Sequence, residues 1–253
     1  MGDLLWVENL SKRFGGIVAT DNLAMAIPEG ELHAVIGPNG AGKTTLIAQL
    51  SGQLAPDSGQ IHFAGSDITA VPTYARSALG LARSFQITSL FLDLSVLDNA
   101  ALAVQARAGH SFHFWRNARR EPELRNPARA ALARVGLTAR ADLPASALSH
   151  GEHRQLELAM ALASNPRMLL LDEPMAGLGP EESARMVSML RDLKKELTIL
   201  LVEHDMEAVF ALADRITVLV YGRVIASGKP EEIRRNAQVR DAYLGEQEAV
   251  HGG

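Results

Sequence analysis

Two glycines, a lysine and a threonine near the N-terminus have the spacing of a phosphate-binding loop. They form the pattern Gly37-x-x-x-x-Gly42-Lys43-Thr44, after a predicted strand and at the start of a predicted helix. In such a loop the backbone N–H groups converge on phosphate oxygens, and the positive end of the helix dipole favours the anion. Lys43 would reach the β- and γ-phosphates of a nucleotide, and Thr44 would coordinate Mg²⁺. A chance glycine turn is the alternative, and the strand–loop–helix context makes it the rarer explanation.

A pair of acidic residues follows an apolar segment in the second half of the chain. Asp172 and Glu173 come directly after Met168–Leu171, which is predicted to be a strand. In open α/β sheets, ligands bind at the carboxyl ends of the strands. Asp172 would hold Mg²⁺ through water, and Glu173 would polarise an attacking water. The pair alone is equally consistent with an N-cap of the next helix, and the phosphate loop favours the catalytic interpretation.

A second apolar strand, Thr198–Val202, is followed by Glu203-His204-Asp205. His204 is a candidate hydrogen-bond donor to a γ-phosphate from this neighbouring strand. A surface or capping histidine is the alternative, and His204 alone would favour that alternative.

Apolar segments and turn residues predict the elements that carry these groups. Continuous apolar strands between helices predict a mostly parallel sheet covered on both faces. The stretch from about Thr88 to Ser146 is rich in Ala, Leu and Arg, which predicts a helical lobe inserted into the α/β core. The other predicted strands are Leu4–Val7, Glu31–Ile36, Gln60–Phe63, Ile216–Val220 and Arg223–Ala226, the last two as a hairpin, and the other predicted helices are Thr44–Leu50, Glu152–Leu162 and Glu181–Lys195.

The composition of the 253 residues restricts the classes of function. A net charge of -4 gives no support to nucleic-acid binding, which usually goes with a basic excess. The absence of cysteine excludes disulfides, thiolate metal sites and cysteine nucleophiles. The first residues lack the basic and apolar regions of a signal peptide, and no segment is long and apolar enough to cross a bilayer. Any role at a membrane therefore requires a partner.

The segment Leu148-Ser149-His150-Gly151-Glu152 resembles the signature motif of the ATP-binding-cassette ATPases, whose usual form is Leu-Ser-Gly-Gly-Gln. Gln86 after Phe85 matches the family's Q-loop glutamine, His204 its switch histidine, and Phe14 the aromatic residue that stacks on adenine. These motifs occur in the family's order from residue 14 to residue 204.

The resemblance implies a single nucleotide-binding domain over residues 1–253. Its fold would be α/β, a P-loop NTPase core with a mostly parallel sheet, an antiparallel β subdomain and an inserted α-helical subdomain. The helical subdomain would span about residues 88–160, and a C-terminal helical tail about residues 225–253.

The resemblance also assigns the site residues and the bound ATP and Mg²⁺. The catalytic residues would be Glu173, His204 and Gln86, and the metal site would involve Thr44, Gln86 and Asp172. Two subunits would close head to tail, so that each ATP is covered by Ser149 and Gly151 of the other subunit. The ATP-binding residues would be Phe14, Gly37, Pro38, Asn39, Gly40, Ala41, Gly42, Lys43, Thr44, Thr45, Ser149 and Gly151.

Two positions depart from the family pattern. His150 replaces the first glycine after the signature serine, and would either add a donor or lie aside. Gly179 stands where many cassettes have an aspartate, which puts in doubt the contact that this aspartate makes across the dimer.

Finer resemblance concerns the substrate. The segments Arg83–Gln86, Val202–Met206 and Val239–Glu246 are similar to those of branched-chain amino-acid importer ATPases. The implied partners are two integral-membrane permease subunits, a second ATPase subunit and a periplasmic solute-binding protein, and the implied location is the cytoplasmic face of the bacterial inner membrane. Urea or amide importers and the lipopolysaccharide-export ATPase share parts of these features. A soluble cassette acting on DNA or ribosomes and an inactive regulatory cassette are the remaining alternatives.

Overall fold

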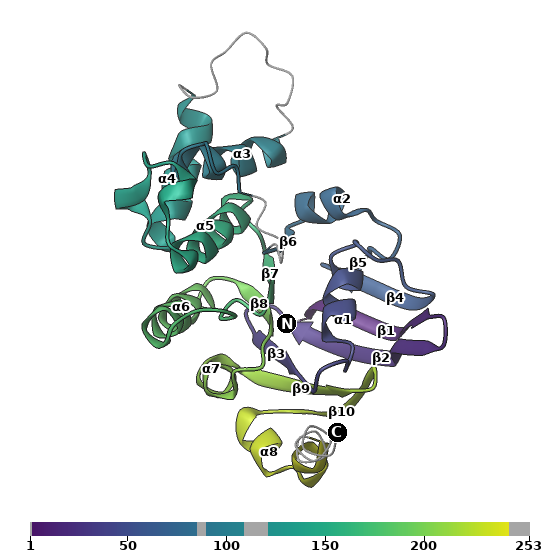
Figure 1. Cartoon of the computed structure of the whole chain (residues 1–253). Helices are drawn as coiled ribbons and strands as arrows, with labels where there is room; N and C mark the ends of the chain where they lie inside the picture. Colours follow the sequence, from purple (N-terminus) through teal and green to yellow (C-terminus); the bar gives the residue numbers. More distant parts are fainter. Residues whose placement is uncertain (1, 85–89, 109–120, 243–253) are drawn as a thin grey trace.

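Two β-sheets and a group of helices make up the fold (Figure 1). The computed structural model describes residues 2–84, 90–108 and 121–242. None of the helices in these ranges combines the length and the apolar character that a membrane span requires. The predicted α/β fold is confirmed, with one largely parallel sheet, one antiparallel sheet and a separate group of helices.

The larger sheet has the strand order β10-β9-β3-β8-β7-β6. All neighbours pair in parallel except β9 and β10, which form the predicted hairpin. The strands are β3 (Leu32–Ile36), β6 (Leu81–Arg83), β7 (Met168–Asp172), β8 (Thr198–Val202), β9 (Arg215–Val220) and β10 (Arg223–Gly228).

The smaller sheet is antiparallel, with the order β2-β1-β4-β5. Its first strand is longer than the predicted Leu4–Val7, and its second strand was not predicted at all. Polar residues such as Asp21 and Asn22 interrupt the apolar alternation of that strand, and this lowers its sequence signal. The strands are β1 (Asp3–Phe14), β2 (Ile17–Pro28), β4 (Ser58–Phe63) and β5 (Ser66–Asp67).

Helices cover the larger sheet and form a separate layer beside it (Figure 1). Helices α3, α4 and α5 pack against one another as the helical subdomain. The exact domain boundaries stay predictions, but β10 continues to Gly228, so the C-terminal helix begins later than residue 225. The helices are α1 (Lys43–Leu50), α2 (Thr73–Ala78), α3 (Val96–Ala108), α4 (Pro122–Arg134), α5 (His150–Ala163), α6 (Pro180–Leu193), α7 (Met206–Leu212) and α8 (Pro230–Arg235).

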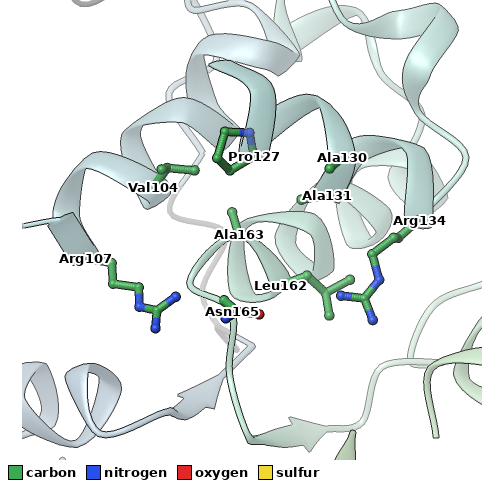
Figure 2. A pocket seen from close by; sticks show the side chains of 9 residues that line it. All are labelled: Val104, Arg107, Pro127, Ala130, Ala131, Arg134, Leu162, Ala163 and Asn165. Atoms are coloured by element: carbon green, nitrogen blue, oxygen red, sulfur yellow. The ribbon is translucent and has the colours of Figure 1, made fainter. Parts of the chain in front are cut away.

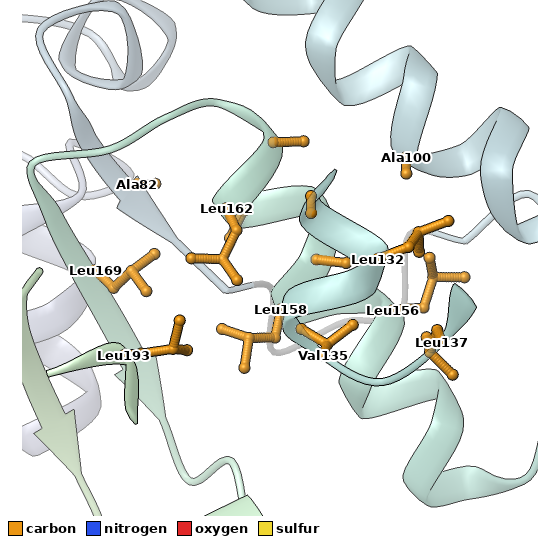
Figure 3. Packing of buried hydrophobic residues seen from close by; sticks show 14 of the residues in the cluster. Ala82, Ala100, Leu132, Val135, Leu137, Leu156, Leu158, Leu162, Leu169 and Leu193 are labelled. Atoms are coloured by element: carbon orange, nitrogen blue, oxygen red, sulfur yellow. The ribbon is translucent and has the colours of Figure 1, made fainter. Parts of the chain in front are cut away.

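The apolar strands separate two hydrophobic cores. In β7, Leu169 and Leu171 join the core that includes α5 and α6, whereas Met168 and Leu170 join the core that includes α1 and the antiparallel sheet. This two-residue alternation is the geometry of a strand buried on both faces. Figure 3 shows Leu158 and Leu162 of α5 on the side that faces Leu169, so the helical subdomain shares its core with the sheet.

A buried arginine fixes the C-terminal end of α1, the helix that follows the phosphate loop. Arg76 is only 2% exposed, and its guanidinium donates to the carbonyls of Gln49 and Leu50, each at 2.7 Å. It also donates to the carbonyls of Val71 and Thr69, at 2.7 and 3.0 Å. Burial lowers the pKa of Arg76, because desolvation disfavours the charged form. The bonds to Gln49 and Leu50 add donors at the C-terminal end of α1, where helix carbonyls lack intrahelical partners.

Replacing Arg76 with methionine should therefore destabilise the protein. The substitution keeps much of the side-chain volume but removes four hydrogen bonds from buried and half-buried carbonyls. We expect the free energy of unfolding to fall by at least about 2 kcal/mol, measured by urea denaturation. Arg129→Met on the exposed face of α4 is the control and should change stability by less than about 0.5 kcal/mol. Equal stabilities of the two variants would contradict this role of Arg76.

Candidate nucleotide-binding and catalytic site

The phosphate loop connects β3 to α1, and two of its glycines lie against neighbouring backbone. Gly42 has a φ of 101°, and a Cβ there would lie 2.1 Å from the carbonyl oxygen of Ala19. A Cβ on Gly37 would lie 2.1 Å from the carbonyl oxygen of Leu219. No side chain fits at such distances, and a φ near +100° disfavours every residue except glycine. The two glycines of the motif are therefore required by the packing of the loop.

Lys43 begins α1 and lies across the loop. It is only 8% exposed, and its Nζ donates to the carbonyls of Gly37 and Pro38, at 2.6 and 3.0 Å. Asn39 and Gly40 are exposed at the loop tip, and Thr44 is exposed on the first turn of α1. The loop therefore presents backbone N–H groups, an ammonium and a hydroxyl at one helix N-terminus, which is the chemistry of a polyphosphate site.

The β9–β10 turn supports the loop from behind, a contact that the sequence did not reveal. The backbone N–H of Gly222 donates to the carbonyl of Ala41 at 2.9 Å, and that of Asp21 donates to the carbonyl of Gly222 at 3.0 Å. Gly222 has a φ of 78° and lies against Ala19 and Thr20. The Tyr221-Gly222 signal predicts a turn, but only the fold shows that this turn holds the phosphate loop.

Asp172 ends β7 as a buried carboxylate. It is 7% exposed, and its Oδ2 accepts a hydrogen bond from Nη2 of Arg83 at 3.0 Å. Burial raises the pKa of Asp172, and the charges of Arg83 and Lys43 oppose that effect. Its Oδ1 is buried and has no hydrogen-bond partner among the described residues. An unsatisfied carboxylate oxygen close to a phosphate loop suits a hard cation such as Mg²⁺, directly or through water.

Glu173 and His204 lie together at the ends of the neighbouring strands β7 and β8. Nδ1 of His204 is 4.0 Å from Oε1 of Glu173 and 3.6 Å from Oε2 of Glu203. Glu173 has a left-handed backbone with φ 49°, and its N–H donates to the carbonyl of Val202 at 2.9 Å. The side chains of Glu173 and His204 are 41% and 66% exposed, so both are accessible to a ligand.

Phe14 and Gln86, predicted to stack on adenine and to act in catalysis, complete the set of predicted residues on the first half of the chain. Phe14 ends β1 and is 49% exposed, which leaves its ring accessible for stacking. Nζ of Lys12 lies 5.8 Å from the centre of that ring. Gln86, predicted for catalysis and for the metal, lies outside the described residues.

The signature residues form the N-terminus of α5. Ser149 is the N-cap: its Oγ accepts from the N–H of Glu152 at 3.2 Å, and its own N–H donates to Oε2 of Glu152 at 2.9 Å. This donation lowers the pKa of Glu152, with a smaller contribution from Arg140. A hollow of about 450 Å³ beside these residues contains no phosphate-loop residue. It is lined by Arg140, Ser149, Gly151, Glu152, Gln155, Leu178, Glu182, Arg185 and Met186.

The two departures from the family pattern lie in adjoining segments. Nε2 of His150 is 3.2 Å from the position that a Cβ on Gly177 would occupy, so the imidazole lies against the loop before α6. Gly179 ends that loop, and its N–H donates to Oε2 of Glu182 at 3.3 Å. Glu182 also lies against Gly151, because a Cβ there would be 2.3 Å from its Oε1. The start of α5 and the loop before α6 are thus in direct contact.

A larger cavity lies elsewhere, on the helical subdomain. It has a volume of about 560 Å³, and Figure 2 shows Arg107 and Arg134 flanking its apolar floor. None of the predicted site residues lines this cavity. This cavity is separate from the candidate nucleotide site.

Comparisons with known proteins define the class to which this fold and site belong. A family model described as ABC transporter matches residues 20–176, which is more than half of the chain. The chain therefore belongs to the ATP-binding-cassette transporter family and is an ATP-hydrolysing subunit. A second model, described as Branched-chain amino acid ATP-binding cassette transporter, matches residues 223–249.

Individual relatives refine this assignment. The chain is 38% identical over 250 residues to the high-affinity branched-chain amino acid transport ATP-binding protein LivG of Salmonella typhimurium, covering 96% of this chain and 98% of the relative. It is 36% identical over 252 residues to BraF of Pseudomonas aeruginosa, a protein of the same description, with coverages of 96% and 98%. The lipopolysaccharide export system ATP-binding protein LptB of Acidithiobacillus ferridurans is 33% identical over 248 residues, with coverages of 98% and 99%.

Solved structures show the same fold. The ADP conformation of MJ1267, an ATP-binding cassette of an ABC transporter, has a TM-score of 0.85 and 29% identity, covering 97% of this chain and 100% of that chain. A dimeric post-hydrolysis state of the cassette MJ0796 bound to ADP and Pi has a TM-score of 0.75 and 26% identity, covering 89% of this chain and 98% of that chain.

Gly42→Ala should disrupt the phosphate loop. The methyl group would meet the backbone of Ala19, and alanine is strained at this φ, so we expect a loss of at least about 2 kcal/mol of stability and an ATP affinity lowered tenfold or more. Gly65→Ala is the matched control, because Gly65 has a φ of 80° with open space around it. It should cost only about 1 kcal/mol and leave ATP affinity unchanged. Urea denaturation and fluorescent-nucleotide titration measure the two effects, and similar behaviour of both variants would argue against the close-approach explanation.

Proposed function

We propose that this chain binds and hydrolyses MgATP to energise the import of branched-chain or related hydrophobic amino acids. The match of residues 223–249 to the branched-chain amino-acid model supports the substrate class, as do LivG and BraF. The observation that carries the chemical part is the convergence of the phosphate loop, Asp172 and the Glu173–His204 pair at one edge of the larger sheet.

Each group at this edge has a distinct role in the proposal. The loop from Gly37 to Thr45 binds the phosphates, and Lys43 neutralises their charge. Asp172, Thr44 and Gln86 hold Mg²⁺, which supplies positive charge to the phosphate oxygens when bound. Glu173 polarises the attacking water. His204 donates a hydrogen bond to the terminal phosphate, and Phe14 stacks on the base.

The proposal includes a second ATPase subunit, either a copy of this chain or a related chain. Ser149 and Gly151 lie at the N-terminus of α5, and the positive end of a helix dipole favours a bound anion. Their hollow is separate from the phosphate loop of the same subunit, so a facing subunit's ATP is the anion they would cover. ATP would then favour the closed dimer by binding it more tightly than the open one, and hydrolysis would reverse this preference.

The membrane partner in the proposal docks near residues 86–95. Phe91 and Leu92 are 57% and 47% exposed, Leu94 is half-buried, Leu90 packs against the core, and Ile87 lies outside the described residues. The backbone of Phe91 is held by Asn99, which accepts from its N–H at 2.9 Å and donates to its carbonyl at 3.0 Å. Exposed apolar groups on an anchored backbone suit a docking surface.

The complete system in this proposal has two integral-membrane permeases and a periplasmic solute-binding protein. The ATPase would lie at the cytoplasmic face of the bacterial inner membrane. Nucleic acid is not a proposed partner, because the net charge is -4. Lipopolysaccharide export is the second candidate because of the similarity to LptB, but the match at residues 223–249 favours amino-acid import.

Glu173→Gln tests the chemistry. An amide of the same shape no longer polarises water as a base, so we expect turnover to fall about 10²- to 10⁴-fold while MgATP still binds. The closed dimer should accumulate with ATP, as measured by light scattering after gel filtration. Glu207→Gln, an exposed glutamate in the first turn of α7, should keep the parental rate. Hydrolysis by Glu173→Gln at the parental rate would show that Glu173 is not the base.

Phe91→Asp tests the docking surface and the substrate together. In a transporter reconstituted with its permeases and binding protein, a charge at this exposed apolar site should abolish leucine uptake while MgATP affinity stays unchanged. Leu102→Asp, at a 36% exposed leucine on α3, is the control and should keep uptake. Unchanged uptake by Phe91→Asp would discard this site, and a parental complex that imports urea but not leucine would discard the substrate class.

A further inference from the structure

Glu203 is a fully buried acidic residue between the loops that carry Glu173 and His204. It is 0% exposed, although it follows the last residue of β8 at the edge of the sheet where those two side chains are accessible. Burying a carboxylate is costly unless hydrogen bonds replace the lost water. The position of Glu203 therefore has to be explained by its contacts.

Three backbone amides donate to the carboxylate of Glu203. Oε1 accepts from the N–H of Met175 at 2.9 Å. Oε2 accepts from the N–H groups of His204 and Asp205, at 2.9 and 3.2 Å. Hydrogen bonds to an ionised acceptor are stronger than those between neutral groups. The carboxylate therefore links the backbone at Met175 to the backbone at His204 and Asp205.

The donors belong to the two segments that carry the reacting groups. Met175 comes two residues after Glu173, and the N–H of Ala176 donates to the carbonyl of Glu173 at 3.0 Å. Glu173 itself has a φ of 49°, a conformation that persists only where the surroundings hold it. On the other side, the bond from the His204 N–H fixes the backbone from which the imidazole extends.

We infer that Glu203 is a positioning residue that sets the Glu173 and His204 loops relative to each other. It is buried and contacts backbone amides, so it acts through those two residues and not on ATP itself. The inference rests on the proposed roles of Glu173 and His204. Its consequence is that the reaction rate depends on the Glu203 carboxylate, whereas ATP binding at the phosphate loop does not.

The number of acceptor oxygens explains why a carboxylate is required. Glutamine has the same size but only one acceptor oxygen, and its NH₂ group would face one set of backbone donors. Glu203→Gln therefore has to release either Met175 or the His204–Asp205 pair. Because misplacement of catalytic groups by about 1 Å costs roughly 100-fold in rate, we expect kcat to fall about 10- to 100-fold. The KM for ATP should stay within about threefold of the parental value, because Gly37–Thr45 is not touched.

Steady-state ATP hydrolysis by the full chain tests this inference. Glu157→Gln is the matched control: Glu157 is also a buried glutamate, 4% exposed, but it lies on α5 beside Arg154. It should leave kcat unchanged. Glu203→Asp keeps the charge and shortens the side chain, so its kcat should lie between the parental and the Glu203→Gln values. Should Glu203→Gln not fold, a lowered kcat with an unchanged KM in Glu203→Asp supports the inference.

Two outcomes would overturn the inference. One is a parental kcat in Glu203→Gln or, if that variant does not fold, in Glu203→Asp. The other is a fall in kcat accompanied by an equal rise in KM, which indicates a general loss of structure. Glu173→Gln and His204→Ala are measured alongside. If both remain active, the proposed catalytic roles fail, whereas low activity in both with a parental rate in Glu203→Gln removes only the role of Glu203.

Discussion

The parallel pairing of β3, β8 and β7 is the constraint on which the site depends. Val35 pairs with Val202, and Val202 pairs with Asp172, so the carboxyl ends of three strands meet at one edge. The residues that follow these strands are the phosphate loop, Glu203-His204 and Glu173. Groups more than 100 positions apart in the chain thus become neighbours because parallel strands in register end together. A shift of one residue in this register would turn the apolar side chains toward the wrong cores. It would also move the phosphate loop out of line with the residues that follow β7 and β8.

Buried charges at this edge are stabilised in different ways. Asp172 is paired with Arg83, and Lys43 is held by loop carbonyls. Glu203 is surrounded by backbone donors. These arrangements place charge in a poorly solvated region before any ligand binds, which reduces the reorganisation needed when charge develops in a reaction. Within the described part of the chain, Oδ1 of Asp172 has no hydrogen-bond partner, which is consistent with a site whose hydrogen bonding is completed by a bound cation.

The helical subdomain provides the other half of the proposed ATP site. Its core is continuous with one face of the larger sheet, so it is packed onto the sheet by the same leucines that bury the strands. His150 touches the loop that leads from Glu173 to α6, and Gly151 lies against Glu182 in the first turn of α6. The signature surface and the catalytic edge of one subunit are therefore joined by contacts. In a head-to-tail dimer, the signature residues of each subunit would cover the ATP bound to the other subunit. The same signature residues would also contact the catalytic edge of their own subunit.

Much of the fold, and the segments that carry most residues of the candidate site, could be predicted from the sequence. The phosphate loop, the buried strands β7 and β8, the hairpin β9–β10 and the Asp172-Glu173 pair all have short-range signals: glycine spacing, apolar runs and turn residues. The strand β2 was missed because its apolar alternation is broken by polar residues, and β6 because it is only three residues long.

Glycine spacing, apolar runs and turn residues thus indicated the candidate residues of the site and most of the strands and helices, since these signals depend on neighbours along the chain. The tertiary structure alone decided that Arg83 pairs with Asp172, that Gly222 supports the phosphate loop and that Glu203 joins the loops of Glu173 and His204. The partners of Arg83 and Gly222 lie more than 80 positions away in the sequence. Such contacts leave no local pattern, because they arise only when parallel strands bring distant segments to one edge.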